Sequence, residues 1–366
     1  MDWKRMLARY GIPVMFVLTG GYFGAAPVGG KYHVATWGND AWPGGALAPL
    51  ATIRAANAKA DVRQVWVKPG TYADAPDRSG VVYVGAVDAP GDTLSREERI
   101  ITGPVSLRGP LTKIQGFTLA GGLFFKGGAD RDSVIDCRVR GDLGFYASAT
   151  KACRLPALVR CDLDLRSIDA RDGSGVDRSM TAPRVVEPTF ESCQVTVTRK
   201  VGEPDRVLWR MSSVDRPRLL RSSFTLTHQT GGSNGDDAAS IKFLSVRGID
   251  AQDCIFTSDY LGDFMGTGPF FPMLRDSTYG AWRRCTFESV RGNMYFSPNT
   301  AGTWVCSCSG STFDEIVLKA PGTIFFYQCP IRGDRWSRSH AFAGRFNKYN
   351  SGGIPTGLVV GPYVGP

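Results

Sequence analysis

The chain has 366 residues, a formal net charge of +9 and 43% hydrophobic residues. Its Lys and Arg residues are dispersed, without the dense basic block of a nucleic-acid-binding tail, so we expect no nucleic-acid partner. Of the nine Cys, only Cys306 and Cys308 stand close together, and neither a second pair nor a partner His completes a zinc site. We therefore expect neither a metal nor a cofactor.

Residues 1–30 begin with three basic residues in the first nine positions, continue through the apolar run Ile12–Leu18 and reach small residues at Gly24–Ala26. This order is typical of a secretory signal peptide, and the run is too short to span a bilayer comfortably. It also suits an N-terminal arm that docks the protein into a larger assembly. We expect the arm, with a signal peptide as the alternative.

A short helix is predicted in residues 31–75, where Thr52 precedes Ala55, Ala56 and Ala58. The Thr52 hydroxyl can accept a hydrogen bond from an amide of the first turn, as an N-cap does. Such a helix would cover the open end of a stack of strands and shield its unpaired backbone.

The same residues contain, in chain order, the strand Lys31–Val34, the turn Trp37–Asp40, the step Pro49–Ile53 and the strand Val65–Tyr72. This succession resembles the opening of the pectate-lyase-like right-handed β-helix proteins. It implies that residues 31–75 form the N-terminal cap and first coil of an all-β, right-handed parallel β-helix. It indicates a fold and a broad superfamily rather than an activity.

A six-residue pattern recurs between residues 134 and 331, as in Val134–Val139 and Leu158–Leu163. Its centre is a Cys or Ser, and an apolar residue follows two positions later. The centres are Cys137, Cys161, Cys193, Ser222, Cys254, Cys285, Ser311 and Cys329. They lie 18 to 32 residues apart, a period that predicts a solenoid of short strands. Residues 76–334 are therefore expected to form the β-helix.

The Cys centres are predicted to stack as small buried side chains in the core. Unpaired thiols suit folding in a reducing cytoplasm better than export through an oxidising compartment. Binding and chemistry are then expected in the irregular stretches between strands, of which the longest are 169–188, 227–240 and 260–279.

Gly235–Asp237, followed by Ile241–Lys242, resembles part of the polygalacturonase pattern. The resemblance implies catalytic carboxylates at Asp236 and Asp237, one acting as acid and one activating water. The other motifs of that family are missing here, so a polar turn is the alternative. A lyase would instead need a base and cationic groups that neutralise a uronate carboxylate. Lys242 is the cationic candidate beside the acidic pair.

Two cationic pairs suit a lyase, namely Lys242 with Arg247 and Arg210 with Arg184. Aromatic residues late in the repeats are the stronger binding signal, because sugar rings stack on such side chains, and so do partner subunits. The predicted binding residues are Tyr260, Phe264, Tyr279, Trp282 and Tyr295.

Residues 335–366 are basic and aromatic at first and then apolar with Gly and Pro, and we expect a closing or oligomerisation tail. The favoured function is a phage virion protein of the tailspike or tail-fibre kind. It would be a homotrimer that contacts other virion proteins through its N-terminal arm and binds bacterial surface polysaccharide. The alternatives are a secreted polysaccharide lyase or glycoside hydrolase, and a purely structural virion decoration protein.

Overall fold

The computed structural model describes the chain from residue 29 onward. The described ranges are 29–85, 98–148, 150–171, 184–199, 208–228, 241–244, 246–260, 270–275, 279–288, 291–296, 301–309, 312–318, 323–327 and 345–349. Beyond residue 257 they comprise the backbone of strands and the side chain of Cys285. Asp236, Asp237, Phe264 and nearly all of the predicted N-terminal arm lie outside these ranges, as does most of the C-terminal tail.

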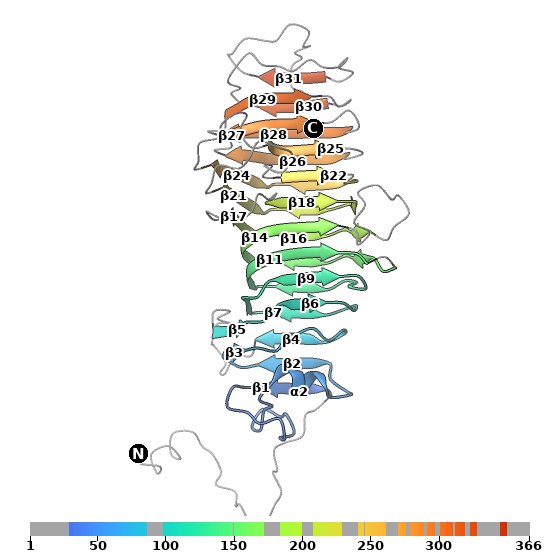
Figure 1. Cartoon of the computed structure of the whole chain (residues 1–366), viewed down its shortest axis with the longest axis vertical. Helices are drawn as coiled ribbons and strands as arrows, with labels where there is room; N and C mark the ends of the chain where they lie inside the picture. The colour runs from blue at the N-terminus through green and yellow to red at the C-terminus, as the bar shows by residue number, and fades with distance from the viewer. Residues whose placement is uncertain are drawn as a thin grey trace, which may run out of the picture.

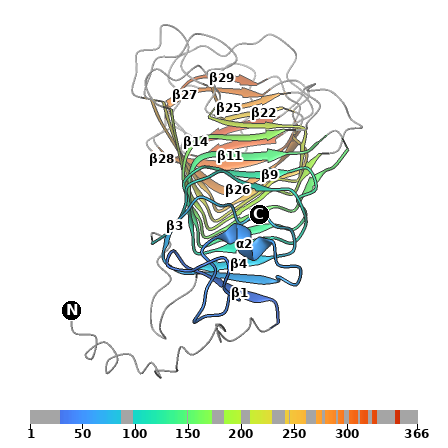
Figure 2. The ribbon, with the colours of Figure 1, turned by 60° about the horizontal axis from the view of Figure 1, so that its bottom comes forward.

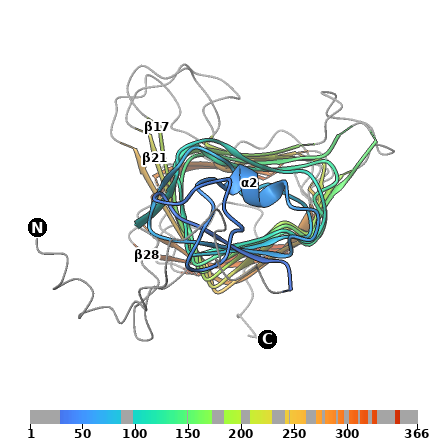
Figure 3. The same cartoon turned by 90° about the horizontal axis from the view of Figure 1, so that it is seen from below.

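The described residues are nearly all β-strand, and each pairing between strands is parallel, with partners drawn from successive passes of the chain. The strands stack in one column (Figure 1), and the view from below superimposes them on one outline (Figure 3). This arrangement is consistent with the predicted parallel β-helix. Three ladders of strands make up the column, and we call them ladders I, II and III.

Ladder I contains β1 (Lys31–Val34), β2 (Gln64–Val67), β4 (Val82–Gly85), β7 (Lys113–Gln115), β10 (Ser133–Ile135), β13 (Ala157–Val159), β16 (Thr189–Glu191), β20 (Arg218–Leu220), β23 (Ile249–Gln252), β26 (Tyr279–Glu288), β28 (Ala301–Ser309), β30 (Thr323–Tyr327) and β31 (Arg345–Tyr349). The last of these, β31, lies within the predicted C-terminal tail and pairs with β30.

Ladder II contains β3 (Gly70–Tyr72), β5 (Arg99–Ile101), β8 (Thr118–Leu119), the first halves of β11 (Arg138–Tyr146) and β14 (Asp162–Arg171), β17 (Gln194–Arg199), β21 (Ser223–His228), β24 (Ile255–Tyr260) and the second halves of β26 and β28. Both β11 and β14 continue from ladder II into ladder III, with a register shift after Gly141.

Ladder III contains β6 (Val105–Leu107), β9 (Leu123–Lys126), the second halves of β11 and β14, β18 (Trp209–Ser212), β22 (Ile241–Leu244), β25 (Phe270–Arg275), β27 (Arg291–Phe296) and β29 (Thr312–Leu318). A small three-stranded sheet follows at the next corner, formed by β12 (Cys153–Arg154), β15 (Val185–Val186) and β19 (Val214–Asp215).

The predicted helix is α2 (Ile53–Asn57), which ends one residue before Ala58. Its predicted N-cap is confirmed, because Thr52 Oγ1 accepts a hydrogen bond from the Ala55 amide at 3.0 Å. Ile53 and Ala56 are buried, so the helix packs on the first strands. Figure 3 places α2 inside the outline of the column at its N-terminal end. That it shields the backbone there remains a prediction.

The Cys column is confirmed for the centres from Cys137 to Cys285, all of which are buried, as is Ser222. The thiols reach back to the preceding pass of the chain. Cys161 Sγ donates to the Val134 carbonyl at 3.3 Å, and Cys254 Sγ donates to the Leu219 carbonyl at 3.2 Å. The small side chain therefore fills the core and also satisfies a backbone acceptor.

The residue before each of the five centres from Cys137 to Cys254 adopts the left-handed conformation, although none of these five residues is glycine. The angle φ is 53° at Asp136, 51° at Arg160 and 54° at Ser192. At the first four of these turns the amide donates to a carbonyl of the next pass, as from Asp136 to Val159. This hydrogen bond offsets a backbone conformation that costs an L-residue about 1–2 kcal/mol.

The core is one contiguous cluster of inward-facing apolar residues. Stacked aromatic rings run through it, with centroids 5.2 Å apart for Phe125 and Phe145 and 5.1 Å apart for Phe224 and Phe256. Alternate residues of each strand face outward, because successive side chains of a strand point to opposite sides. A functional site is therefore expected on these outward residues or on the segments that connect the strands.

Candidate functional site

The outer face of ladder III carries a group of aromatic, basic and acidic side chains, which we call the ladder III face. On β9, Leu123 and Phe125 are fully buried, so Phe124 and Lys126 point outward. The parallel register then builds two columns across adjacent strands. One column is Phe124, Gly144, Asp169 and Arg210, and the other is Lys126, Tyr146, Arg171 and Ser212.

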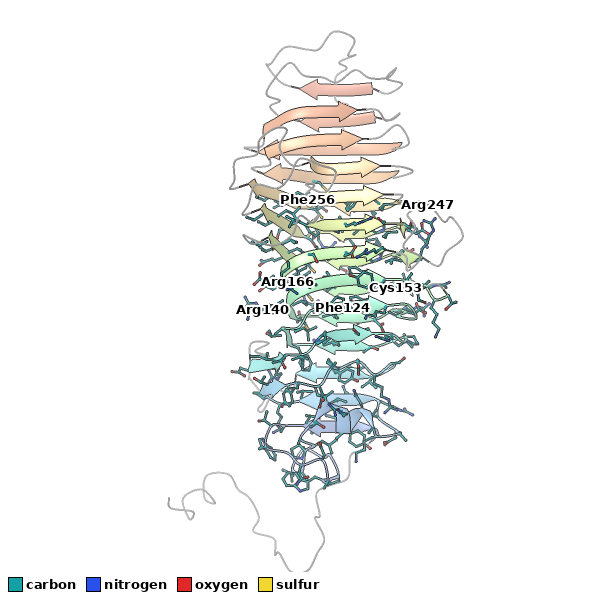
Figure 4. All side chains as sticks on the ribbon, in the orientation of Figure 1. Phe124, Arg140, Cys153, Arg166, Arg247 and Phe256 are labelled. Atoms are coloured by element: carbon teal, nitrogen blue, oxygen red, sulfur yellow. The ribbon has the colours of Figure 1, made fainter. Side chains whose placement is uncertain are left out.

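Two aromatic rings form the floor of this face. The rings of Phe124 and Tyr146 stack with centroids 6.3 Å apart and an interplanar angle of 18°. A Cβ added at Gly144 would lie 2.3 Å from the Tyr146 ring and 2.9 Å from the Phe124 ring, so both rings lie close over this glycine. Figure 4 shows Phe124 on the front of the column. Gly144 therefore lets the rings lie down on the strand as a platform.

Asp169 is the acidic centre of the face. Its Oδ2 accepts hydrogen bonds from the Tyr146 hydroxyl at 3.3 Å and from Arg171 Nε at 2.7 Å. Its Oδ1 is buried and accepts no hydrogen bond from the described residues. A buried acceptor without a partner is costly, so this oxygen is available to a donor supplied by a ligand.

Burial, and then the charge of Asp169, raise the pKa of Tyr146 to about 12. The phenol is consequently protonated near neutral pH and acts as a hydrogen-bond donor. It cannot serve as a ready base at that pH. Arg171, the register neighbour of Tyr146 on β14, also has its guanidinium carbon 5.9 Å from the centroid of the Tyr146 ring.

Positive charge predominates on the ladder III face. Lys126 Nζ lies 5.7 Å from the centroid of the Phe124 ring. Arg210 follows Asp169 in register, and its Nε donates to Ser212 Oγ at 3.4 Å. Lys242 follows Arg210 in register on β22. Lys126, Arg171 and Arg210 thus share these columns with Asp169, and Lys242 occupies the next register position, which suits a ligand that carries negative charge.

A second carboxylate, Asp142, lies where β11 enters ladder III. It pairs with Arg166 and accepts a hydrogen bond from Ser167 Oγ at 3.1 Å. Figure 4 shows Arg166 at the left margin of the column, near Arg140. Asp142 and Asp169 are therefore both paired with Arg. Their arrangement supports binding better than the acid and base pair of a glycoside hydrolase.

Three of the residues singled out from the sequence lie in the register of this face, namely Arg210, Lys242 and Tyr295. In the register, the neighbour of Arg210 is Lys242 and not Arg184, the partner expected from the sequence. Arg184 instead pairs with Asp215 at 3.4 Å. Tyr295 on β27 continues the Arg210–Lys242 column through Met273.

The other predicted binding residues lie elsewhere. Trp282 on β26 follows Ala251 and Leu219 in ladder I, and both of these are buried. On the earlier strands, the side chain at this register position is therefore buried. Tyr260 ends β24 on ladder II beside His228, and Tyr279 begins β26 beside Ala301.

The irregular stretch predicted over residues 169–188 needs correction at its beginning. Asp169 was placed at the start of such a stretch, and it lies inside β14. Phe124, Tyr146 and Asp169 were not identified from the sequence. Their alternation with buried residues was visible, but only the register shows that they are neighbours.

Comparisons with known proteins identify no family. No family model matches the chain, and no curated protein matches it. A solved rhamnogalacturonan lyase is 12% identical, covering 81% of this chain and 73% of its own, with a TM-score of 0.39. A GH136 lacto-N-biosidase from Eubacterium ramulus is 10% identical, covering 86% of this chain and 66% of its own, with a TM-score of 0.34. At these TM-scores neither likeness carries an argument about function.

No helix among the described residues is long and apolar enough to cross a membrane. No group of three or more His, Cys, Asp or Glu in the same residues is placed to hold a metal ion.

Proposed function

We propose that this protein binds an anionic polysaccharide along the ladder III face of a right-handed parallel β-helix. The observation that carries the proposal is the Phe124–Tyr146 platform beside Asp169 and surrounded by basic side chains. A sugar ring would stack on the two rings, because aromatic side chains offer a large apolar surface with a polar edge. A sugar hydroxyl would donate to Asp169 Oδ1.

The basic residues select the charge of the ligand. Arg171, Arg210 and Lys242 would bind carboxylates on the polymer, since guanidinium groups match carboxylate geometry with two parallel hydrogen bonds. Successive strands of a ladder lie about 4.8 Å apart, so the columns run along the stack in the direction that an extended polymer would follow.

The setting that we propose for this binding is the surface of a phage virion. The protein would be a homotrimer that attaches to other virion proteins through its N-terminal arm. It would contact the bacterial glycan through the ladder III face. The buried free thiols of the Cys column support folding in a reducing cell. The alternatives are a secreted lyase or glycoside hydrolase, with Asp236, Asp237 and Lys242 as candidate catalytic residues, and a structural decoration protein.

Binding is tested by calorimetric titration with acidic and neutral bacterial polysaccharides. Tyr146→Ala and Arg210→Ala are expected to weaken binding of the acidic polymer at least about tenfold, or about 1.4 kcal/mol. Thr225→Ala, an outward change on ladder II, is the matched control and should bind normally. Equal affinity of all three variants and the wild type would exclude the ladder III face.

Activity and assembly are tested separately. Depolymerisation is followed by the release of reducing or unsaturated sugar ends, with Asp236→Asn and Asp237→Asn as variants. Cleavage that neither substitution reduces would exclude these two carboxylates. Light scattering measures the mass in solution, and a monomer would contradict the virion setting.

A further inference from the structure

A lysine lies at one corner of the aromatic platform on the ladder III face. The outward positions of β9 and β11 form a square in the register, whose corners are Phe124, Lys126, Gly144 and Tyr146. Figure 2 shows these two strands side by side along the column. Phe124 and Tyr146 are diagonal in the square, and both rings lie close over the Gly144 corner. Lys126 therefore occupies the corner that the rings leave, at the edge of the platform.

The ammonium group of Lys126 is held beside the platform. Its Nζ is 5.7 Å from the centroid of the Phe124 ring, where the ring quadrupole attracts a cation. It makes no hydrogen bond and no ion pair with the part of the chain that the structure describes. An ammonium group in this position can bind the anionic group of a ligand that lies on the two rings.

The opposite side of the platform is electrically balanced. Arg171, which follows Tyr146 in the register, donates from Nε to Asp169 Oδ2 at 2.7 Å and forms an ion pair with the same carboxylate. The Tyr146 hydroxyl donates to that oxygen as well, at 3.3 Å. Of the described cations that adjoin the platform, Lys126 and Arg171, only Lys126 is thus without a carboxylate partner among the described residues.

The preceding pass of the chain places a second positive charge next to Lys126. Leu107 on β6 pairs with Phe125 on β9, so the residues that follow them, Arg108 and Lys126, are consecutive along the stack. Arg108 is exposed. Like charges on neighbouring strands are unfavourable, and an anionic ligand bound between them would offset that cost. The end of the platform toward β6 therefore favours negative charge.

The two ends of the platform differ in the chemistry that they offer to one sugar ring. A cation, Lys126, lies at the end toward β6, and a hydrogen-bond acceptor, Asp169, lies at the end toward β14. Two strand spacings separate β9 from β14, or about 10 Å along the stack. A single ring bridges this distance when its substituents are hydrogen-bonded at both ends. The platform can therefore orient an acidic sugar.

Building on the proposed function, we propose that Lys126 is the specificity-determining residue of the ladder III face. The sugar that stacks on Phe124 and Tyr146 is itself an acidic unit of the polymer, a hexuronate. Its carboxylate accepts a charge-assisted hydrogen bond from the Lys126 ammonium, and one of its hydroxyl groups donates to Asp169. A neutral sugar stacks on the same rings but leaves the ammonium group without an anion, so it binds more weakly.

The experiment is a calorimetric titration of the full chain with a glucuronate trisaccharide and with the uncharged glucose trisaccharide. The wild type is expected to bind the charged ligand about tenfold more tightly, or by about 1.4 kcal/mol. Lys126→Gln should lose most of this preference while its affinity for the uncharged ligand stays unchanged. Lys126→Arg should keep the preference. The affinity of Lys126→Gln for the charged ligand should also depend less on salt than that of the wild type.

Lys113→Gln is the matched control, because it removes the same charge from an outward position on ladder I. It should leave the affinities for both ligands unchanged, and the melting temperature of each variant reports its folding. The inference is overturned if Lys126→Gln keeps the wild-type preference for the charged ligand. It is also overturned if Lys126→Gln weakens the binding of both ligands equally, the result that a purely structural role beside Phe124 would give.

A failure of the proposed function gives a different result. If the wild type binds neither ligand, or if Tyr146→Ala binds both as the wild type does, the ladder III face is not a glycan site and the role of Lys126 is refuted with it. If Tyr146→Ala weakens binding while Lys126→Gln keeps the preference, the face binds glycan and only the role of Lys126 is refuted.

Discussion

A buried carboxyl group at the corner before β10 should make the stability of this protein depend on pH. Asp132 is fully buried, and its Oδ1 accepts a hydrogen bond from the Thr112 amide at 2.6 Å. Its Oδ2 is buried without a partner among the described residues. Burial raises the pKa of Asp132 from 3.8 to about 7, against the opposing effect of the Thr112 hydrogen bonds.

The sign of the effect follows from this direction. The folded protein holds the proton of Asp132 more tightly than the unfolded chain, so the protonated form favours folding. The contribution is fully present below about pH 4 and is lost as the pH rises to about 7. A shift of about three pKa units corresponds to at most about 4 kcal/mol. Because the surrounding turn is polar, we expect about 2 kcal/mol in practice.

Asp132→Asn tests this reasoning, because the amide has the shape of the protonated acid and does not titrate. Urea unfolding from pH 5 to pH 8 is followed by circular dichroism for both proteins. Between pH 5 and pH 8, the free energy of unfolding of the variant should rise by about 2 kcal/mol relative to that of the wild type. Cys153→Ala is the control, because burial raises the pKa of the neighbouring Cys153 to about 12 and this thiol stays protonated throughout. Cys153→Ala should lower the free energy of unfolding by the same amount at each pH. A constant difference between Asp132→Asn and the wild type would refute the assignment.

Three further changes test other parts of the structure. Cys254→Arg should prevent folding, because it places a charge in the core. Cys254→Ser should lower the free energy of unfolding by about 1 kcal/mol. Equal melting temperatures of Cys254→Arg and the wild type would disprove the Cys column. Thr52→Ala should cost about 1 kcal/mol by removing the N-cap of α2, measured by urea unfolding, and no change would mean that the cap contributes little. Gly144→Ala should displace the Phe124 and Tyr146 rings and weaken glycan binding about tenfold, or about 1.4 kcal/mol, in calorimetry. Unchanged affinity would show that the platform does not hold the sugar.

Local patterns decided much of the architecture before any contact was known. The Cys and Ser centres could be found because a small residue recurs between short apolar segments, although the structure places the centres from Cys137 to Cys254 at the turn between two strands and not inside one. The N-cap at Thr52 depends on a hydrogen bond that spans three residues, so it too is local. Signals of this kind need no knowledge of which strands are neighbours.

The candidate site depends on contacts between strands that are unevenly spaced along the chain. Phe124 and Gly144 are 20 residues apart, Gly144 and Asp169 are 25 apart, and Asp169 and Arg210 are 41 apart, yet they are successive members of one column. No fixed period joins them, because connections of different length separate the strands. A shift of one residue would also turn each outward side chain inward. The sequence alone therefore determined the all-β repeat and its small buried centres, whereas only the tertiary structure decided which outward side chains meet, because the register is set by packing between passes of the chain.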